Sequence, residues 1–342
     1  MERNDLIGKI VETAGDYRKG EIAKFDAAHV EKWVSQFPLP KEEQTIILHE
    51  LAHMLGNFYI SKQAAEKNTR RILNIMSQER AGGCPVTDVT FLRTQEEGKS
   101  QNAILEIADG ILKDMHGVTT KECGGSKVFV YLDDCLYSGN KWRYDIRDSI
   151  QLPAKCEGMK IISYHFAIYS GGRDYAKPYV EGYVSQRGGQ LIMFRHDWYE
   201  NVRDGENSLD IIWPQYIQGN KFVTSYVSHV ANFCANMGWS QRPLFRKKQR
   251  MSANVFTSAK NQHIVEQAFL DAGARMFCAA NNPALSMRPM GFEVIATLGF
   301  GTPIVTWRNI PNNAPLALWY GDPSLGPNHP LGKWYPLFPR KM

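Results

Sequence analysis

The chain of 342 residues is 43 % hydrophobic and 22 % charged, with a formal net charge of +5. This composition supports a sizeable core in one large domain or two modest ones and excludes a globally disordered chain. The six cysteines are scattered without a C-x-x-C pair, which is typical of reduced thiols in a cytosol. The polar start and the lack of a run of about 18 apolar residues predict no signal peptide and no membrane span, so we expect a cytoplasmic protein without membrane partners.

Residues 1–80 are predicted to form a helical region. Apolar side chains recur at helical spacing after Asp26, which is a plausible N-cap, and Pro38 and Pro40 end that helix. Two more helices are expected at about 41–55 and 62–78. The segment 82–85, Gly-Gly-Cys-Pro, then breaks the chain and marks a domain boundary, with an α/β domain over 81–342.

His49-Glu50-Leu51-Ala52-His53 is a literal H-E-x-x-H. On a helix its two histidines share one face, as zinc ligands require, and Glu50 would act as general base of a metallopeptidase. The third ligand of the metzincin pattern would fall at position 59, which is tyrosine. The other interpretation is a pair of ordinary helix histidines. The sequence favours this second interpretation, and no bound zinc is expected.

After Gly83, short apolar runs alternate with amphipathic segments, which predicts a mostly parallel α/β sheet. Candidate strands cover residues 89–92, 128–132, 160–168, 191–194 and 275–279, and candidate helices cover 100–115, 141–151, 173–187, 221–237 and 259–272. Residues 291–320 are predicted to contain β structure and turns. The segment 321–342 is rich in proline, glycine and tryptophan.

The run Val-Phe-Val-Tyr-Leu at 128–132 leads directly into Asp133 and Asp134. Its length and its β-branched and aromatic residues are typical of a strand buried on both faces. Open α/β sheets bind their ligands at the carboxyl ends of such strands. Because successive strand residues point to opposite faces, the two acids need not do the same work, and Asp134 is expected to matter more.

The residues after the acids predict a phosphate-binding loop formed by Ser138, Gly139 and Asn140. Glycine lets backbone N–H groups approach an anion closely, and a helix beginning near Lys141 adds positive potential at its N-terminus. Lys141 can pair with a phosphate as a point charge. Tyr137 flanks the loop, where it could stack on a base or simply pack.

A second phosphate site is predicted at Arg93, Lys99 and Ser100, which lie in a strand–loop–helix segment upstream of the acids. Gly98-Lys99-Ser100 matches the end of a Walker A loop, but the first glycine of that motif would fall at Arg93. This excludes a nucleoside triphosphatase. Two interpretations stay open: a diphosphate-binding loop, or a polar turn with Ser100 as a helix cap.

The segment 128–141 resembles the ribose-phosphate signature of type I phosphoribosyltransferases: apolar strand, two acids, three spacers, a hydroxyl residue, glycine, a spacer and a second hydroxyl residue. The resemblance implies that Asp133 and Asp134 hold ribose hydroxyls and that the loop binds the 5′-phosphate. It also implies a Mg²⁺ ion near these acids, and phosphoribosyl diphosphate or a nucleotide as ligand. This sequence has Lys141 at the position of the second hydroxyl residue.

The chain over about 25–341 is similar to the PRTase-CE family of bacterial conflict systems. The residues that carry this likeness are 33–37 (Trp-Val-Ser-Gln-Phe), 137–139 (Tyr-Ser-Gly), 299–303 (Gly-Phe-Gly-Thr-Pro), 307–313 (Trp-Arg-Asn-Ile-Pro-Asn-Asn) and 334–340 (Trp-Tyr-Pro-Leu-Phe-Pro-Arg). The resemblance implies a sheet of the type I phosphoribosyltransferase kind, an N-terminal helical region and a C-terminal hood-like segment. Arg308, Asn309 and Asn313 would cap the cleft.

The same resemblance implies an effector in antiphage defence, partnered by a reverse transcriptase with its nucleic acid or by another defence protein. Three functions are therefore open: a phosphoribosyltransferase-like enzyme, a catalytically inactive module that binds a nucleotide or a partner, and a zinc metallopeptidase. Phosphoribosyl transfer needs acids near the ribose hydroxyls, and Mg²⁺ and cationic groups on the leaving diphosphate.

Overall fold

The computed structural model describes residues 2–76, 78, 83–96, 99–326 and 328–340. It divides into two compact units, one made of Met1–Ser61 with Arg203–Met342 and the other of Lys62–Val202. This division differs from the boundary near residue 80 that the sequence suggested. The physical reason is that the N-terminal helices pack against α9 (Ala259–Ala279) in the C-terminal half of the chain, whereas α4 (Lys62–Ile75) packs with the sheet unit.

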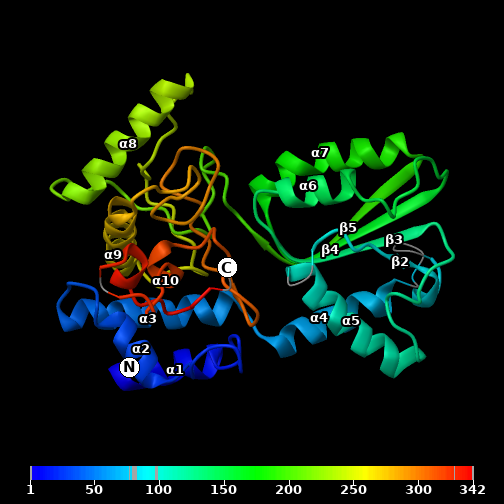
Figure 1. The fold of residues 1–342 in the computed structure, drawn as a ribbon, viewed down its shortest axis with the longest axis horizontal. Coiled ribbons are helices and arrows are strands. Elements are labelled where there is room, and N and C mark those ends of the chain that lie inside the picture. Colours follow the sequence, from blue (N-terminus) through cyan, green and yellow to red (C-terminus); the bar gives the residue numbers. More distant parts are fainter. Residues whose placement is uncertain (1, 77, 79–82, 97–98, 327, 341–342) are drawn as a thin grey trace. The chain divides into compact units, whose positions relative to one another are not determined.

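The sheet unit contains four parallel strands in the order β2-β3-β4-β5. They are β2 (Thr90–Phe91), β3 (Val128–Leu136), β4 (Met159–Tyr169) and β5 (Gly189–Tyr199). Helices α4 and α5 (Ser100–His116) lie on one face, and α6 (Asn140–Arg147) and α7 (Ser170–Gln186) lie on the other (Figure 1). The prediction of a parallel sheet with 128–132 in an interior strand is confirmed, because β3 pairs with β2 and β4.

Strand β3 is longer than the sequence suggested, because it continues through both acids to Leu136. Asp133 is in register with His165 of β4, and Leu136 with Ile168. The two acids are therefore residues of the strand itself, in the part of β3 that pairs with β4 and extends beyond its pairing with β2. Phe129 and Tyr131, which alternate with Asp133 on one face, pack in a core with Trp142 and Ile146 of α6.

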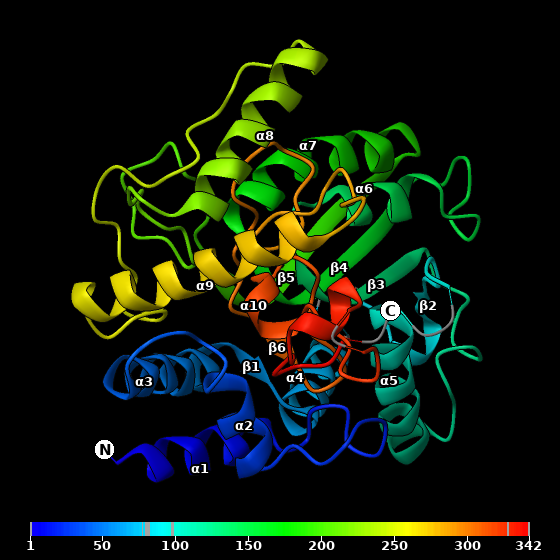
Figure 2. The same cartoon turned by 60° about the vertical axis from the view of Figure 1, so that its left-hand side comes forward.

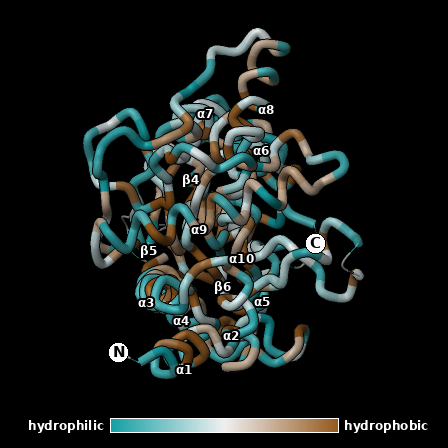
Figure 3. The backbone as a smooth tube through the Cα atoms, turned by 90° about the vertical axis from the view of Figure 1, so that its left-hand side faces the viewer, coloured by the Kyte–Doolittle hydropathy of each residue, from teal (hydrophilic) through white to brown (hydrophobic). Residues whose placement is uncertain are grey.

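The other unit is mainly helical. It holds α1 (Arg3–Ala14), α2 (Ala27–Val34), α3 (Lys41–Phe58), α8 (Lys221–Met237), α9 and α10 (Leu316–Trp319), with β1 (Tyr59–Ile60) paired in parallel with β6 (Val305–Thr306). Figure 2 shows α9, in gold, beside α3 and α10, which it contacts. Helix α1 carries both hydrophobic and hydrophilic residues along its tube (Figure 3), and its buried side includes Leu6, Ile7 and Ile10.

Several predicted elements have the expected positions. The Asp26 side chain caps α2 by accepting from the His29 N–H at 3.0 Å, and α8 begins and ends where the sequence indicated. The predicted strand 275–279 is wrong, because these residues are the last turns of α9. Its short apolar run fits a buried helix as well as a strand, and burial against α3 and α10 selects the helix.

The C-terminal segment is mostly turns around β6, α10 and a 3-10 helix at Pro330–Lys333, and a second 3-10 helix, Val86–Asp88, precedes β2. Among the described residues, no helix is both long enough and apolar enough to cross a membrane.

Candidate functional site

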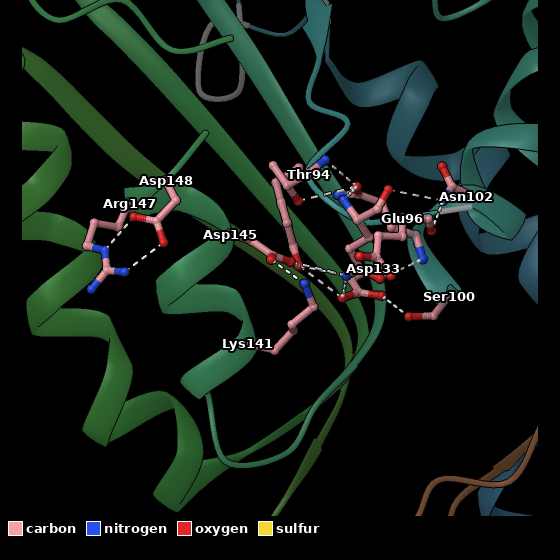
Figure 4. A network of polar contacts seen from close by, with 12 residues as sticks. Thr94, Glu96, Ser100, Asn102, Asp133, Lys141, Asp145, Arg147 and Asp148 are labelled. Atoms are coloured by element: carbon pink, nitrogen blue, oxygen red, sulfur yellow. Dashed lines mark hydrogen bonds and ion pairs between the residues drawn. The ribbon is translucent and has the colours of Figure 1, made fainter. Parts of the chain in front are cut away.

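The carboxylate of Asp133 is buried, with 6 % of the residue exposed, and it is surrounded by donors. Its Oδ1 accepts from Ser100 Oγ at 2.7 Å and from the Asp134 N–H at 2.9 Å. Its Oδ2 accepts from Gln95 Nε2 at 2.8 Å and from the Tyr131 hydroxyl at 3.0 Å. Figure 4 shows Asp133 with Ser100 beside it. A carboxylate offers about four lone-pair positions, and three donors occupy those of Asp133 besides the Tyr131 hydroxyl, whose single proton is shared with a second acid.

A second buried acid, Asp145 of α6, shares these donors. The Tyr131 hydroxyl lies 2.8 Å from Asp145 Oδ2, and Gln95 Nε2 lies 3.2 Å from the same oxygen. Burial and the two acids raise the pKa of Tyr131 far above its ordinary value, so its hydroxyl keeps its proton. Lys141 Nζ lies 2.5 Å from Asp145 Oδ1 (Figure 4) and is the cation of this group. Lys141, in the first turn of α6, thus neutralises the buried charge of Asp145.

Asp134 is only half-buried, and as the next strand residue it points to the opposite face from Asp133. Its Oδ1 accepts from the Cys135 N–H at 2.6 Å. The two acids therefore do not share one site. Of the pair, Asp134 is the one that reaches the surface at the carboxyl end of an interior strand.

The predicted phosphate loop forms a tight turn between β3 and α6. Gly139 has φ +75°, and a Cβ there would overlap the carbonyl oxygen of Gly172 and the methyl group of Ala176 in α7. Only glycine fits this left-handed, crowded position. Ser138 is exposed, and α6 begins at Asn140, so the first amides of the helix have no partner within the helix. The Tyr137 ring lies beside Tyr169, with centroids 6.0 Å apart.

The predicted diphosphate residues do not gather in one place. Ser100 begins α5 and contacts Asp133, as noted above. Arg93 instead directs its guanidinium to Thr120 Oγ1 at 2.5 Å and to Asp109 Oδ2 at 3.8 Å. Lys99 is exposed at the N-cap of α5, and Gly98 lies outside the described residues. The turn is fixed by Gln101, whose Oε1 accepts from the Thr94 N–H at 2.8 Å.

His165 lies beside Asp133 in the sheet and is 1 % exposed. Burial lowers its pKa to about 4, partly offset by the charge of Asp133, so the ring is neutral at pH 7. Its Nδ1, Trp142 Nε1 and Ser163 Oγ are buried, and none has a hydrogen-bond partner in the described part of the chain. His165 is thus a core residue of the sheet.

The H-E-x-x-H residues have structural partners in the helical unit. Glu50 is fully buried and accepts from the Thr257 N–H at 2.8 Å, from the Thr257 hydroxyl and from Asn261 Nδ2 at 2.7 Å. Burial alone would raise its pKa, but these hydrogen bonds at the start of α9 hold it below the ordinary value. His53 Nε2 donates to the Ala253 carbonyl at 2.7 Å. Within the described ranges, His, Cys, Asp and Glu do not form any group of three that could hold a metal ion.

The predicted cap residues belong to the helical unit. Asn313 Nδ2 donates to the Phe292 carbonyl at 2.8 Å, and Asn309 Oδ1 accepts from the Ile310 N–H at 3.1 Å. Arg308 is half-buried and its charge lowers the pKa of Tyr17, which burial raises far more. These contacts shape the loop around 306–314. The role of the three residues as a cleft cap stays a prediction.

Sequence reasoning missed three members of the polar network, namely Gln95, Tyr131 and Asp145. Two signals for them exist. Asp145 follows Lys141 by four residues, the spacing of helix ion pairs, and Tyr131 precedes Asp133 by two, which puts both on one strand face. Gln95 lies in a loop and offers no such pattern.

An interior parallel strand with two acids near its carboxyl end, followed by a glycine turn and a helix N-terminus, is the arrangement expected of a phosphoribosyltransferase-like α/β fold. The family model PRTase-CE matches residues 30–340, nearly the whole chain, and the protein belongs to this family. No curated protein and no solved structure matches the chain.

Proposed function

We propose that the carboxyl end of β3 binds the ribose-phosphate part of phosphoribosyl diphosphate or of a nucleotide, and that the protein is a phosphoribosyltransferase-like effector. The observation that carries the proposal is the placement of Asp134. It is half-buried at the end of an interior parallel strand, five residues before the glycine turn that starts α6. Ligands of open α/β sheets bind at this edge.

The two acids have different tasks in this proposal. Asp134 accepts hydrogen bonds from the ribose hydroxyls. Asp133, which is buried and accepts from Ser100, Gln95 and the Asp134 N–H, acts as a positioning residue that fixes this part of the strand. The family signature assigns ribose contact to both acids, and the burial of Asp133 argues for this narrower assignment.

The 5′-phosphate is proposed to contact the backbone N–H groups at the start of α6 and the Ser138 hydroxyl. Helix N-termini favour anions, and Gly139 brings the backbone close because it has no side chain. Lys141 is exposed over 61 % of its side chain, so its ammonium can reach a phosphate while it stays near Asp145.

In the proposed transfer, the bond between C1 of the ribose and the diphosphate oxygen breaks, and C1 forms a bond to an acceptor. The ring carbon gains positive character, which the Asp134 carboxylate stabilises electrostatically. A Mg²⁺ ion held by both acids does not fit this arrangement, because neighbouring strand residues point to opposite faces and the buried Asp133 carboxylate is already hydrogen-bonded. Asp134 could supply one oxygen to an ion that arrives with the diphosphate.

The biological role that we propose is antiphage defence, in a complex with a reverse transcriptase and its nucleic acid or with another defence protein. The support for this role is membership of the PRTase-CE family.

A second candidate is a module that binds the ligand without turnover. Two contacts favour it: the Arg93 guanidinium is committed to Thr120 and Asp109, and Lys141 is paired with Asp145. Departure of the diphosphate needs cationic groups nearby. Of the two predicted diphosphate-binding cations, Arg93 is engaged within the protein, and Lys99 makes no ion pair with any of the described residues. A zinc peptidase has no comparable support, since the carboxylate of Glu50 is buried against α9.

The test uses labelled phosphoribosyl diphosphate with the full chain. Binding is measured by calorimetry and turnover by release of diphosphate, with and without Mg²⁺. We expect binding in the wild-type protein and its loss in Asp134→Asn, which keeps size and fold. Binding without turnover, in the presence of the partners, would favour the module. Unchanged binding in folded Asp134→Asn would refute the assignment of the ribose site.

A further inference from the structure

A pocket of about 360 Å³ lies in the helical unit, between the end of α9 and the 3-10 helix Pro330–Lys333. Its size falls within the range of small-molecule sites. The greater part of its lining is apolar and comes from Trp334, Met276, Ala279, Pro38 and Pro330. None of its residues takes part in the predicted site at β3.

The neutral polar groups of the lining are already engaged. Gln36 donates from Nε2 to the Tyr335 carbonyl at 2.7 Å and accepts at Oε1 from the Tyr335 N–H at 2.9 Å. Trp334 Nε1 donates to the Ala317 carbonyl at 2.9 Å, so the indole is held by its polar edge. The ring of Trp334 also packs edge-on with Phe37 at 5.1 Å, which fixes its orientation. Because these groups are already hydrogen-bonded within the protein, they need no polar partner from a ligand.

Three charged side chains line the pocket, and two of them pair with each other. Arg275 Nε lies 2.8 Å from Asp271 Oδ2, and its guanidinium lies over Phe222 at 4.6 Å. The other oxygen of Asp271 accepts from Asn220 Nδ2 at 2.6 Å. Lys333, by contrast, makes no hydrogen bond or ion pair with any residue that the structure describes. Among the described residues that line the pocket, the exposed Lys333 is therefore the charged side chain without a counter-charge.

We propose that this pocket binds a small molecule with a flat apolar body and a single anionic group. The body packs against Trp334, Met276 and the two prolines, where burial of apolar area drives binding. The anion, a carboxylate, sulfonate or phosphate, pairs with Lys333, which acts as a point charge and sets no planar geometry. This inference does not depend on the function proposed for β3.

Two matched probes test the ligand class. Anilinonaphthalene sulfonate has a flat apolar body and one negative charge, and phenylnaphthylamine has nearly the same body without the charge. Both fluoresce more strongly when they leave water. We expect saturable binding of one sulfonate probe per chain, tighter by about tenfold than the neutral probe, as a charge-assisted contact allows.

Two variants and a control assign the site. Lys333→Met removes the charge but keeps an extended side chain, and it should abolish the preference for the sulfonate while leaving the neutral probe unchanged. Ala279→Trp fills the pocket and should remove both probes. Lys260→Met changes an exposed lysine in the first turn of α9 and should have no effect. Circular dichroism and thermal unfolding confirm that each variant is folded.

Three outcomes of the probe experiment would contradict the proposal in different ways. If Ala279→Trp removes both probes but Lys333→Met keeps the sulfonate preference, the pocket is real and the anionic ligand class is wrong. If neither variant changes sulfonate binding, the probe binds elsewhere and the proposal is refuted. Binding that Lys333→Met and Lys260→Met weaken equally would show a general charge effect and would also overturn the assignment.

Discussion

The ammonium of Lys141 lies 2.5 Å from a carboxylate oxygen of Asp145, one helical turn further along α6. Asp145 has only 4 % of its side chain exposed, while Lys141 has 61 %. A buried carboxylate needs a partner, and here the partner comes from the loop that the sequence assigned to phosphate binding. This explains why a lysine can stand where the family signature has a hydroxyl residue.

Lys141→Ala should lower the free energy of unfolding by about 1 kcal/mol, because it leaves the buried Asp145 without its cation. The matched control is Lys177→Ala, which breaks a pair at the same spacing with the exposed carboxylate of Glu181 and should cost about 0.3 kcal/mol. Urea unfolding measures both. Equal losses would mean that Asp145 does not depend on Lys141. The same variant should weaken binding of phosphoribosyl diphosphate, as should Lys99→Ala.

Gly139→Ala should destabilise the sheet unit by about 3 kcal/mol, since a methyl group would add a clash with Gly172 to the strain of a positive φ. Gly117→Ala is the matched control, because Gly117 has φ +73° but open space around its Cβ position. We expect a loss of about 1 kcal/mol there. Thermal unfolding of the two variants isolates the steric part, and similar losses would contradict tight packing of the loop against α7.

His165 predicts a pH dependence of stability. Its pKa is lowered to about 4 in the folded protein, so between pH 4 and the ordinary value near 6.5 the unfolded chain binds more protons. Stability therefore falls as the pH drops through this window. From pH 7 to pH 5 the expected loss is about 2 kcal/mol. Denaturant unfolding at the two pH values should show this loss in the wild type and a smaller one in His165→Gln. Identical losses would mean that His165 is already solvated.

Glu50→Ala should cost about 2–3 kcal/mol, because the Thr257 N–H and Asn261 lose a buried acceptor at the start of α9. Glu42→Ala, on the exposed first turn of the same helix, is the control and should change little. Metal analysis of the purified protein should find no stoichiometric zinc, and a chelator should leave the melting temperature unchanged. Zinc that is lost in His53→Ala would reverse this prediction and support the peptidase.

The sequence predicted the elements whose signals are local. The apolar run before Asp133 marks an interior strand, Asp26 marks the start of α2, and the alternation of strand side chains separates the two acids. The glycine at position 139 also follows from the signature. Each of these depends on a few neighbouring residues and on rules that hold in most proteins.

What the sequence could not predict depends on contacts between distant segments. Gln95 meets Asp145 across 50 positions, and Arg93 turns to Thr120 because that partner is provided by the fold. The end of α9 was predicted as a strand because its apolar run is too short to distinguish the two by period. The sequence placed a boundary near residue 80, where the composition changes, whereas the two compact units divide after residues 61 and 202.

The division of the chain also sets an order for its folding during synthesis. The sheet unit is one continuous segment, Lys62–Val202, and holds all the strands of its sheet. The helical unit is made of two separate segments of the chain. β1 at Tyr59–Ile60 can pair only after β6 at Val305–Thr306 has left the ribosome, and Glu50 can accept from the Thr257 N–H only after that residue has been synthesised. The acids of β3 are therefore synthesised before α9 and β6, the C-terminal partners of the N-terminal helices and of β1. A chain whose synthesis stops early would have a folded sheet unit and a helical unit that lacks its C-terminal segment.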